Sequence, residues 1–275
     1  MSEHDELRRA LEFYRDLGIR ELRLETIPSE GAAVPAPVVA TPPAEVVPVA
    51  PQQQPPPVAP RQVEPPPPVA AAAAAPPPLL SMAPDNDSLP RILEEIGDCT
   101  RCKLHRGRTK LVFGSGDPGA KLVFVGEGPG ADEDAQGLPF VGRAGQLLTQ
   151  MIEGTASKEG IPIKRPDVYI CNVVKCRPPE NRTPEPDEMQ MCGQFLFRQL
   201  MTIQPKAVCA LGSTAAKALL GTKEGVTKLR GRWHKWNGLP LMVTYHPSYL
   251  LRAYNVAAKR EAWEDLKKVL HFVYD

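Results

Sequence analysis

A proline-rich stretch in the first third of the chain is the feature that most constrains its fold. Of the 32 prolines in 275 residues, 20 lie between Pro28 and Pro90, a stretch of 63 residues with only six charged side chains. It also contains a run of six alanines, Ala70 to Ala75. Such a segment buries too little apolar surface to offset the entropy cost of ordering it. The composition therefore predicts a disordered linker over residues 28–87, partly in the polyproline II conformation.

The linker separates a short head, residues 1–27, from a body, residues 88–275, that is large enough to fold as one domain. The head has apolar side chains at helical spacing, which predicts a short amphipathic helix. They are Leu7, Leu11, Tyr14 and Leu17. Such a helix would either dock on the body or bind a protein partner, and the pattern is consistent with both.

Charge is distributed unevenly along the chain. Of 33 basic and 32 acidic side chains, residues 1–90 carry 6 and 12, which leaves 27 basic and 20 acidic groups, a net charge of +7, on the rest. This basic body is compatible with a polyanionic partner, although an ordinary solvated surface accounts for it equally well. No apolar run approaches the ~18 residues of a membrane span, and the first residues lack a secretory pattern. We therefore expect a cytoplasmic protein without a membrane partner, in which cysteines stay reduced.

The body alternates between strand and helix patterns. Four β-rich apolar runs occupy residues 121–126, 168–174, 207–211 and 239–245. Helical patterns lie before, between and after them, at 88–96, 143–152, 186–203, 214–220 and 259–272. Because strands separated by helices connect through right-handed crossovers, this order predicts a three-layer α/β fold, with a central four-stranded parallel sheet and helices on both faces.

Each predicted strand ends in chemically distinctive residues. A glycine-rich loop, 126–130, follows the first strand, Asn172 ends the second, Ser213 follows the third, and His246 follows the fourth. In parallel sheets, ligands bind beyond the carboxyl ends of the strands. These strand-end residues therefore predict a ligand-binding site at the carboxyl ends of the strands. The glycine-rich loop does not match the fingerprint of a dinucleotide-binding or phosphate-binding loop.

The same residues also have ordinary structural interpretations. Glu133 would be an acid near a helix N-terminus, and Phe140 would be a core aromatic. Asn172 would be a turn residue, and His246 would be a hydrogen-bonded loop histidine. The loop with Lys228, Arg230 and Arg232 fits phosphate contacts or simple solvation equally.

Four of the six cysteines suggest a metal centre. Cys99 and Cys102 form a C-x2-C pair, and Cys176 and Cys192 follow much later with 15 residues between them. Four thiolates suit a structural zinc ion or an iron–sulfur cluster. A zinc ribbon usually has two close pairs, whereas this chain has one. The remaining interpretation is that all six cysteines are merely buried side chains.

Taken together, these segments resemble the family 4 uracil-DNA glycosylases, the iron–sulfur branch of that superfamily. The blocks that carry the resemblance are CTRC at 99–102, GEGPGADED at 126–134, GLPFVGRAGQLL at 137–148, NVVKCRPP at 172–179, TKLRGRW at 227–233 and HPSYLLR at 246–252. They cover nearly all of the body in the family's order, and none of residues 1–90.

The resemblance implies a DNA repair hydrolase, a monofunctional glycosylase that flips uracil out of DNA, releases it and leaves an abasic site for base excision repair. In this family's arrangement, Phe140 would stack on the uracil and Asn172 would read its polar edge. Glu127 and Gly128 would line the pocket. His246 would hold a uracil carbonyl oxygen as negative charge builds on the base.

The resemblance implies three further roles. Glu133 would position or activate the attacking water, and Leu250 would wedge into the space that the base leaves. Lys228, Arg230 and Arg232 would meet DNA phosphates. A [4Fe–4S] cluster would be bound by four cysteines, Cys99, Cys102, Cys176 and Cys192. Uracil-containing DNA, single- or double-stranded, would be the partner of a monomeric enzyme.

Two other classes of protein remain compatible with the sequence. A non-catalytic iron–sulfur protein that binds nucleic acid would hold uracil or abasic DNA without releasing a base. An iron–sulfur electron carrier would show reversible reduction without affinity for DNA. A uracil-release assay distinguishes the enzyme from both.

Overall fold

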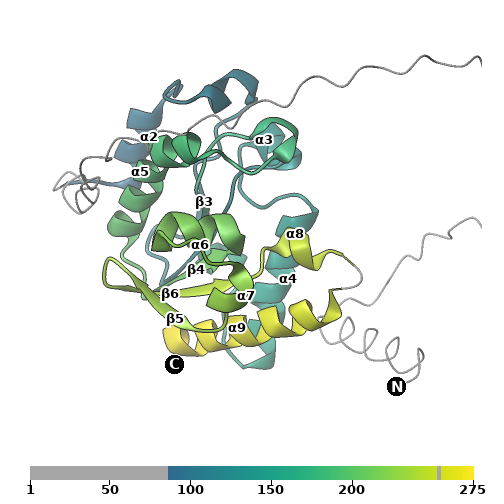
Figure 1. The fold of residues 1–275 in the computed structure, drawn as a ribbon. Coiled ribbons are helices and arrows are strands. Elements are labelled where there is room, and N and C mark those ends of the chain that lie inside the picture. Colours follow the sequence, from purple (N-terminus) through teal and green to yellow (C-terminus); the bar gives the residue numbers. More distant parts are fainter. Residues whose placement is uncertain (1–85, 253–254) are drawn as a thin grey trace, which may run out of the picture. The chain divides into compact units, whose positions relative to one another are not determined.

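The computed structural model describes residues 86–252 and 255–275 (Figure 1). The predicted head helix at 1–27, and the predicted linker up to residue 85, lie outside the described residues. In the described ranges, no helix is both long and apolar enough to cross a bilayer.

The body is built on one sheet with the strand order β1-β3-β2-β4-β6-β5. Its four central strands run parallel to one another and confirm the predicted parallel sheet. They are β3 (Tyr169–Asn172), β2 (Leu122–Gly126), β4 (Ala207–Leu211) and β6 (Leu239–Thr244).

Two antiparallel edge strands were not predicted from the sequence. The two-residue β1 (Ser115–Gly116) pairs with β3, and β5 (Trp233–Trp236) forms a hairpin with β6. The hairpin turns at Asn237 and Gly238, which have positive φ angles of 45° and 82°. An Asn-Gly pair is the typical signal for such a turn, so the sequence did contain the information for β5.

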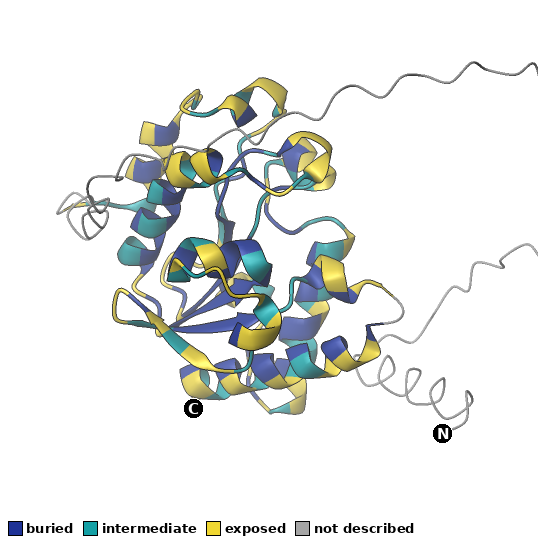
Figure 2. Ribbon diagram, in the orientation of Figure 1, coloured by how far each residue is buried: buried dark blue, intermediate teal, exposed yellow. Residues whose placement is uncertain are grey.

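Helices cover both faces of the sheet, as predicted (Figure 1). On one face, α4 (Arg143–Lys158) and α9 (Val256–Tyr274) share a core with alternate strand residues such as Phe124. On the other face, α5 (Pro186–Ile203) and α6 (Gly212–Leu220) share a core that includes Val125. The central strands are therefore buried on both sides (Figure 2), which explains their continuous apolar sequences.

Shorter helices lie in the connections. Beyond the sheet faces, α2 (Leu89–Ile96) packs on α5. The other short helices are α3 (Ala131–Gln136), α7 (Val226–Leu229) and α8 (Pro247–Leu250), with 3-10 turns η2 (Lys103–Gly107), η3 (Arg165–Asp167) and η4 (Pro179–Asn181).

A close approach between α4 and the preceding loop fixes the position of Phe140. The backbone of Phe140 is left-handed, with φ of 53°, an uncommon conformation for a non-glycine residue. A Cβ atom on Gly145, in the first turn of α4, would lie only 2.6 Å from the Phe140 Cα and closer still to its carbonyl group. Glycine is therefore required at this point of the helix.

We expect Gly145→Ala to destabilise the protein, although alanine normally stabilises a helix relative to glycine by about 1 kcal/mol. The added methyl group has no room against the Phe140 backbone. Thermal unfolding tests this, with Gly193→Ala in α5 as the control, because a methyl group there would meet only the Phe197 ring at 3.7 Å. Equal or opposite shifts in Tm for the two variants would contradict the proposed clash.

Candidate active site

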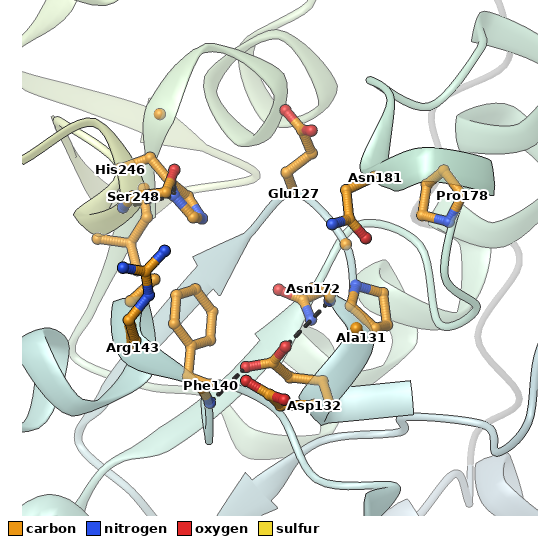
Figure 3. Close-up of a pocket in the computed structure, with 18 of the residues that line it drawn as sticks. Glu127, Ala131, Asp132, Phe140, Arg143, Asn172, Pro178, Asn181, His246 and Ser248 are labelled. Atoms are coloured by element: carbon orange, nitrogen blue, oxygen red, sulfur yellow. Dashed lines mark hydrogen bonds between the residues drawn. The ribbon is translucent and has the colours of Figure 1, made fainter. Parts of the chain in front are cut away.

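A pocket of about 430 Å³ opens where the four parallel strands end (Figure 3). The loops that follow β2, β3, β4 and β6 all contribute to its wall. This wall contains every residue that the resemblance assigned to base binding and catalysis. They are Glu127, Gly128, Glu133, Phe140, Asn172 and His246.

Asn172 presents an unsatisfied polar atom to the pocket. Its side chain is 1% exposed, and its Oδ1 accepts no hydrogen bond from the described residues. It lies opposite Gly126 in the parallel register, and a Cβ there would meet both Asn172 Oδ1 and the Phe140 ring. A buried acceptor left unpaired costs about 1–3 kcal/mol. The site is therefore arranged for a ligand that donates a hydrogen bond at this point, next to an aromatic ring.

The Phe140 ring is held as a fixed platform beside Asn172. Arg165, from η3, donates from Nη2 to the Pro139 carbonyl at 2.7 Å and from Nη1 to the Thr149 hydroxyl at 2.8 Å. These bonds tie the loop of Phe140 to α4. The Phe140 and His246 rings lie 5.6 Å apart between centroids, tilted by 36°. A planar ligand stacked on Phe140 would therefore also lie close to the imidazole.

His246 carries its proton on the nitrogen that is free to face a ligand. The backbone N–H of Ser248, which can only donate, points at Nδ1 at 3.2 Å, so Nδ1 accepts. Burial lowers the pKa of His246 to about 4, and Glu133 opposes this only partly. The ring is therefore neutral near pH 7, and its single proton is on Nε2. A neutral imidazole of this kind can donate to an oxygen atom on which negative charge develops.

Glu133 joins two loops of the pocket. One of its carboxylate oxygens accepts from the N–H groups of Val141 and Gly142, each at 2.9 Å, and the other accepts from Gly130 at 3.1 Å. Three of its roughly four acceptor positions are thus occupied by the backbone. Glu133, which the resemblance assigned to the attacking water, therefore also fixes the position of these loops. Asp132, which the sequence analysis did not single out as a catalytic group, also lines the pocket.

The glycine-rich loop is fastened to its neighbours on both sides. The Thr214 hydroxyl, in α6, donates to the Glu127 carboxylate. The N–H of Val174 donates to the Glu127 carbonyl at 3.2 Å, and a Cβ on Gly128 would lie 2.7 Å from the Val174 side chain. Glycine at 128 therefore lets this loop approach the segment after β3.

The structure corrects the prediction for Leu250. Its side chain is 1% exposed and packs in the core beneath α4 and α9, because it lies on the inner side of the short helix α8. In this structure its side chain therefore faces the core and not the solvent. The next residue, Leu251, is 42% exposed and lines the pocket. The sequence has two adjacent leucines at this point, and only the helix orientation distinguishes them.

The prediction for Arg230 as a DNA contact is also corrected. Its guanidinium donates to both carboxylate oxygens of the buried Asp265, at 2.6 and 2.9 Å, and its side chain is only 17% exposed. This ion pair joins the loop after α7 to α9. Lys228 and Arg232, in contrast, are exposed and remain available to a polyanion.

Several pocket residues were not predicted from the sequence. Arg143, at the start of α4, lines the pocket beside His246 and Ser248, and Asn181 lies on the opposite side (Figure 3). Arg182 also lines the pocket. Arg143 lies within a block that the resemblance covered. Asn181 and the preceding Glu180 both have positive φ, 55° and 54°, which no local pattern indicated.

The four cysteines predicted as metal ligands, Cys99, Cys102, Cys176 and Cys192, line a second cavity. Its other lining residues are apolar side chains and the basic residues Arg101, His105 and Lys175. Burial is the main cause that raises the pKa of Cys102 and Cys176, and it raises that of Cys192 to about 12. None of the six cysteines forms a disulfide. Four gathered thiols of this kind are suited to bind metal, which would expel their protons.

Nitrogen donors already point at three of these sulfurs. The N–H of Lys175 donates to Cys192 Sγ at 3.2 Å, Arg108 to Cys176 Sγ at 3.3 Å, and Arg101 to Cys99 Sγ at 3.7 Å. Such hydrogen bonds orient thiolate ligands and offset their charge. The donor set therefore fits an anionic metal–thiolate centre.

Comparison with known proteins agrees with this geometry. Residues 113–267 match the family model described as the uracil DNA glycosylase superfamily. A type-4 uracil-DNA glycosylase of Thermotoga maritima is 47% identical over 184 residues, which cover 66% of this chain and 93% of the relative. One from Sulfurisphaera tokodaii is 44% identical, covering 66% and 84%. A type-5 uracil-DNA glycosylase of Pyrobaculum aerophilum is 32% identical, covering 56% and 71%. The chain therefore belongs to the uracil DNA glycosylase superfamily and, within it, to the type-4 family.

We expect the His246 imidazole to titrate near pH 4 rather than near its usual 6.5. NMR signals of the imidazole measure this, and His246→Asn identifies which signal belongs to it. Because the unfolded chain binds this proton at a higher pH, the wild type should lose more unfolding free energy than His246→Asn as pH falls from 6.5 to 4. A titration midpoint near 6.5 would contradict a desolvated ring.

Proposed function

We propose that this protein is a uracil-DNA glycosylase whose pocket at the strand ends binds a flipped uracil and hydrolyses its N-glycosidic bond. Family membership supports the activity. The buried, unpaired Oδ1 of Asn172 beside the Phe140 ring is the observation that supports this pocket as the place where uracil binds. The products are free uracil and an abasic site, which base excision repair then processes.

Asn172 is proposed to select the base. Uracil has a donor at N3–H and an acceptor at O4, so the amide of Asn172 gives its Oδ1 to the first and its Nδ2 to the second. Cytosine presents the opposite order, which would leave two buried polar groups facing like groups. Each unpaired group costs about 1–3 kcal/mol, so the two together reject cytosine strongly.

Phe140 and His246 are proposed to act on the same base from two sides. The ring of Phe140 stacks on the uracil face, and the Nε2–H of neutral His246 donates to a carbonyl oxygen of the uracil. When the bond between C1′ and N1 breaks, its electron pair moves onto the uracil. The oxygen of the water bonds to C1′, and the proton that the water loses is finally taken up by N1 of the released uracil. The His246 donor stabilises the charge before that proton arrives.

The attacking water is proposed to lie near the acidic start of α3. Glu133 was the candidate from sequence, and its carboxylate retains one acceptor position after its three backbone contacts. Asp132 lies beside it in the pocket wall. We propose Glu133 as the group that positions the water, and single-turnover rates of Glu133→Gln and Asp132→Asn compare the two.

Access to uracil requires that the base leave the DNA stack, at a cost of a few kcal/mol. Leu251, exposed at the rim of the pocket, is the side chain in a position to fill the space that the base leaves. Lys228 and Arg232 are proposed to contact phosphates, since both are exposed and basic.

The cysteine cavity is proposed to hold a [4Fe–4S] cluster on Cys99, Cys102, Cys176 and Cys192. Four thiolates suit a cluster in which each ligand binds a separate iron. A zinc ribbon usually has two close cysteine pairs, whereas this chain has the single pair Cys99 and Cys102. When bound, the cluster would link the segment before β1 to the segments after β3 and in α5.

Three broader expectations complete the proposal. A cytoplasmic location is supported by six unpaired cysteines, since thiols stay reduced there. We propose a monomeric glycosylase domain over 88–275. The head, 1–27, is proposed as a helix that recruits a protein partner through the linker, 28–87, and both segments lie almost entirely outside the described residues.

The function is tested by incubating the full chain with a uracil-containing oligonucleotide and measuring free uracil and alkali-labile sites. The wild type should release uracil. Asn172→Ala should lower the single-turnover rate by about 10²–10³-fold, the usual effect of removing one such group, while affinity for abasic DNA is retained. Asn237→Ala is the control, because it removes an amide at a strained turn at the other end of β6 and should reduce stability alone. DNA binding without uracil release by the wild type would instead indicate a non-catalytic protein.

The metal centre is tested by elemental analysis of protein purified without oxygen. The wild type should contain iron and absorb visible light, and Cys176→Ser should lose most of both. Cys209→Ala is the matched control, because Cys209 is fully buried in β4 and does not line the cysteine cavity. Stoichiometric zinc without iron would overturn the cluster assignment.

A further inference from the structure

Lys175 is a buried lysine that lies between the base pocket and the cysteine cavity. It follows Asn172 by three residues and directly precedes Cys176. Its side chain is 1% exposed and is among the largest fully buried side chains of the described body. A buried amino group is costly unless it is well hydrogen-bonded.

Each polar group of Lys175 contacts a different part of the body. Its Nζ donates to the main-chain carbonyl of Asn172 at 2.8 Å and to Gln199 Oε1 at 2.6 Å. Its N–H donates to Cys192 Sγ at 3.2 Å, and its carbonyl accepts from the N–H of Val112 at 2.8 Å. One residue thus joins the end of β3, helix α5 and the segment that follows the first two cysteines.

Gln199, which accepts a hydrogen bond from Lys175 Nζ, is itself held in place by two further hydrogen bonds. Gln199, on α5, donates from Nε2 to the Phe113 carbonyl at 3.1 Å and to the Tyr169 hydroxyl at 3.2 Å. Its Oε1 is therefore turned toward Lys175. The Nζ is fixed between Gln199 and Asn172 and can hold the Asn172 main chain in one position.

Compared with an apolar side chain of equal length, the amino group of Lys175 adds the two hydrogen bonds from Nζ. They act on the residue whose side-chain Oδ1 is buried without a partner in the pocket wall. The side chain of Asn172 takes its position from its main chain, which ends β3. The N–H groups of Val173 and Val174 donate to carbonyls of the glycine-rich loop, and the Asn172 carbonyl itself accepts from Lys175 Nζ. A shift of about 1 Å in a group that positions a substrate can cost about 10²-fold in rate.

We propose that Lys175 is a positioning residue for base recognition, which holds the Asn172 amide at the position that uracil requires. The inference rests on the proposed function. Lys175 is expected to act through Asn172 and to make no contact with the DNA itself. Its N–H and carbonyl bonds belong to the backbone, so they survive replacement of the side chain.

Lys175→Met tests this, because methionine retains the apolar length and removes the donor. We expect uracil excision in single turnover to fall by about 10- to 100-fold and inhibition by free uracil to weaken, with iron content and abasic-DNA affinity unchanged. Lys206→Met is the matched control. Lys206 Nζ also donates to a main-chain carbonyl, that of Val273 at 3.0 Å, but it joins the start of β4 to the end of α9.

A double-mutant cycle with Asn172→Ala separates positioning from a general structural role. If Lys175 acts through Asn172, Lys175→Met should add little to the loss caused by Asn172→Ala, whereas independent effects would multiply. Multiplying effects, or excision and uracil inhibition equal to those of the wild type, would overturn the inference. So would loss of iron from both Lys175→Met and Lys175→Gln. A wild type that releases no uracil would instead overturn the proposed function.

Discussion

The parallel pairing of β2 with β3, and of β4 with β6, is the constraint on which the rest of this structure depends. Because these strands run in one direction, Gly126 and Asn172 end side by side, and so do Leu211 and Thr244. The loops that follow them must then share one edge of the sheet. The glycine-rich loop, Asn172, the start of α6 and His246 meet there, although the first and the last of them are more than a hundred residues apart in sequence.

Close backbone approaches then give the pocket its shape. Gly126 leaves room for Asn172 and Phe140, and Gly145 lets α4 begin against the Phe140 backbone. Glu133 and Arg165 fasten the same loop from opposite sides. Two polar atoms are left for a ligand in the pocket, Asn172 Oδ1 and His246 Nε2. The contacts of the surrounding loops hold these two side chains in place, and the two side chains do not hold each other. A rigid pocket of this kind is what discrimination by hydrogen bonds requires, since a mobile amide could adapt to the wrong base.

The cysteine cavity and the base pocket are adjacent parts of one framework. The segment after β3 passes from Asn172 to Cys176 within five residues. Asp134, on α3, accepts from the N–H groups of Thr109 and Lys110 and so ties the segment after the first two cysteines to the acidic wall of the pocket. A cluster that linked the cysteine-bearing segments would therefore stabilise both sides of the pocket without touching a base.

The sequence by itself determined the layer order, the parallel sheet and the strand-end residues that line the pocket, such as Asn172 and His246. Periodicity and strand-end residues are local properties, and parallel strands leave little freedom in where their ends meet. Only the tertiary structure decided the roles of Leu250 and Arg230. Leu250 and Leu251 differ in which side of α8 faces the core, and Arg230 is withdrawn from solvent by Asp265, which is 35 residues away. Partners that distant are brought together by the packing of α9 on the sheet, and no local pattern encodes that packing.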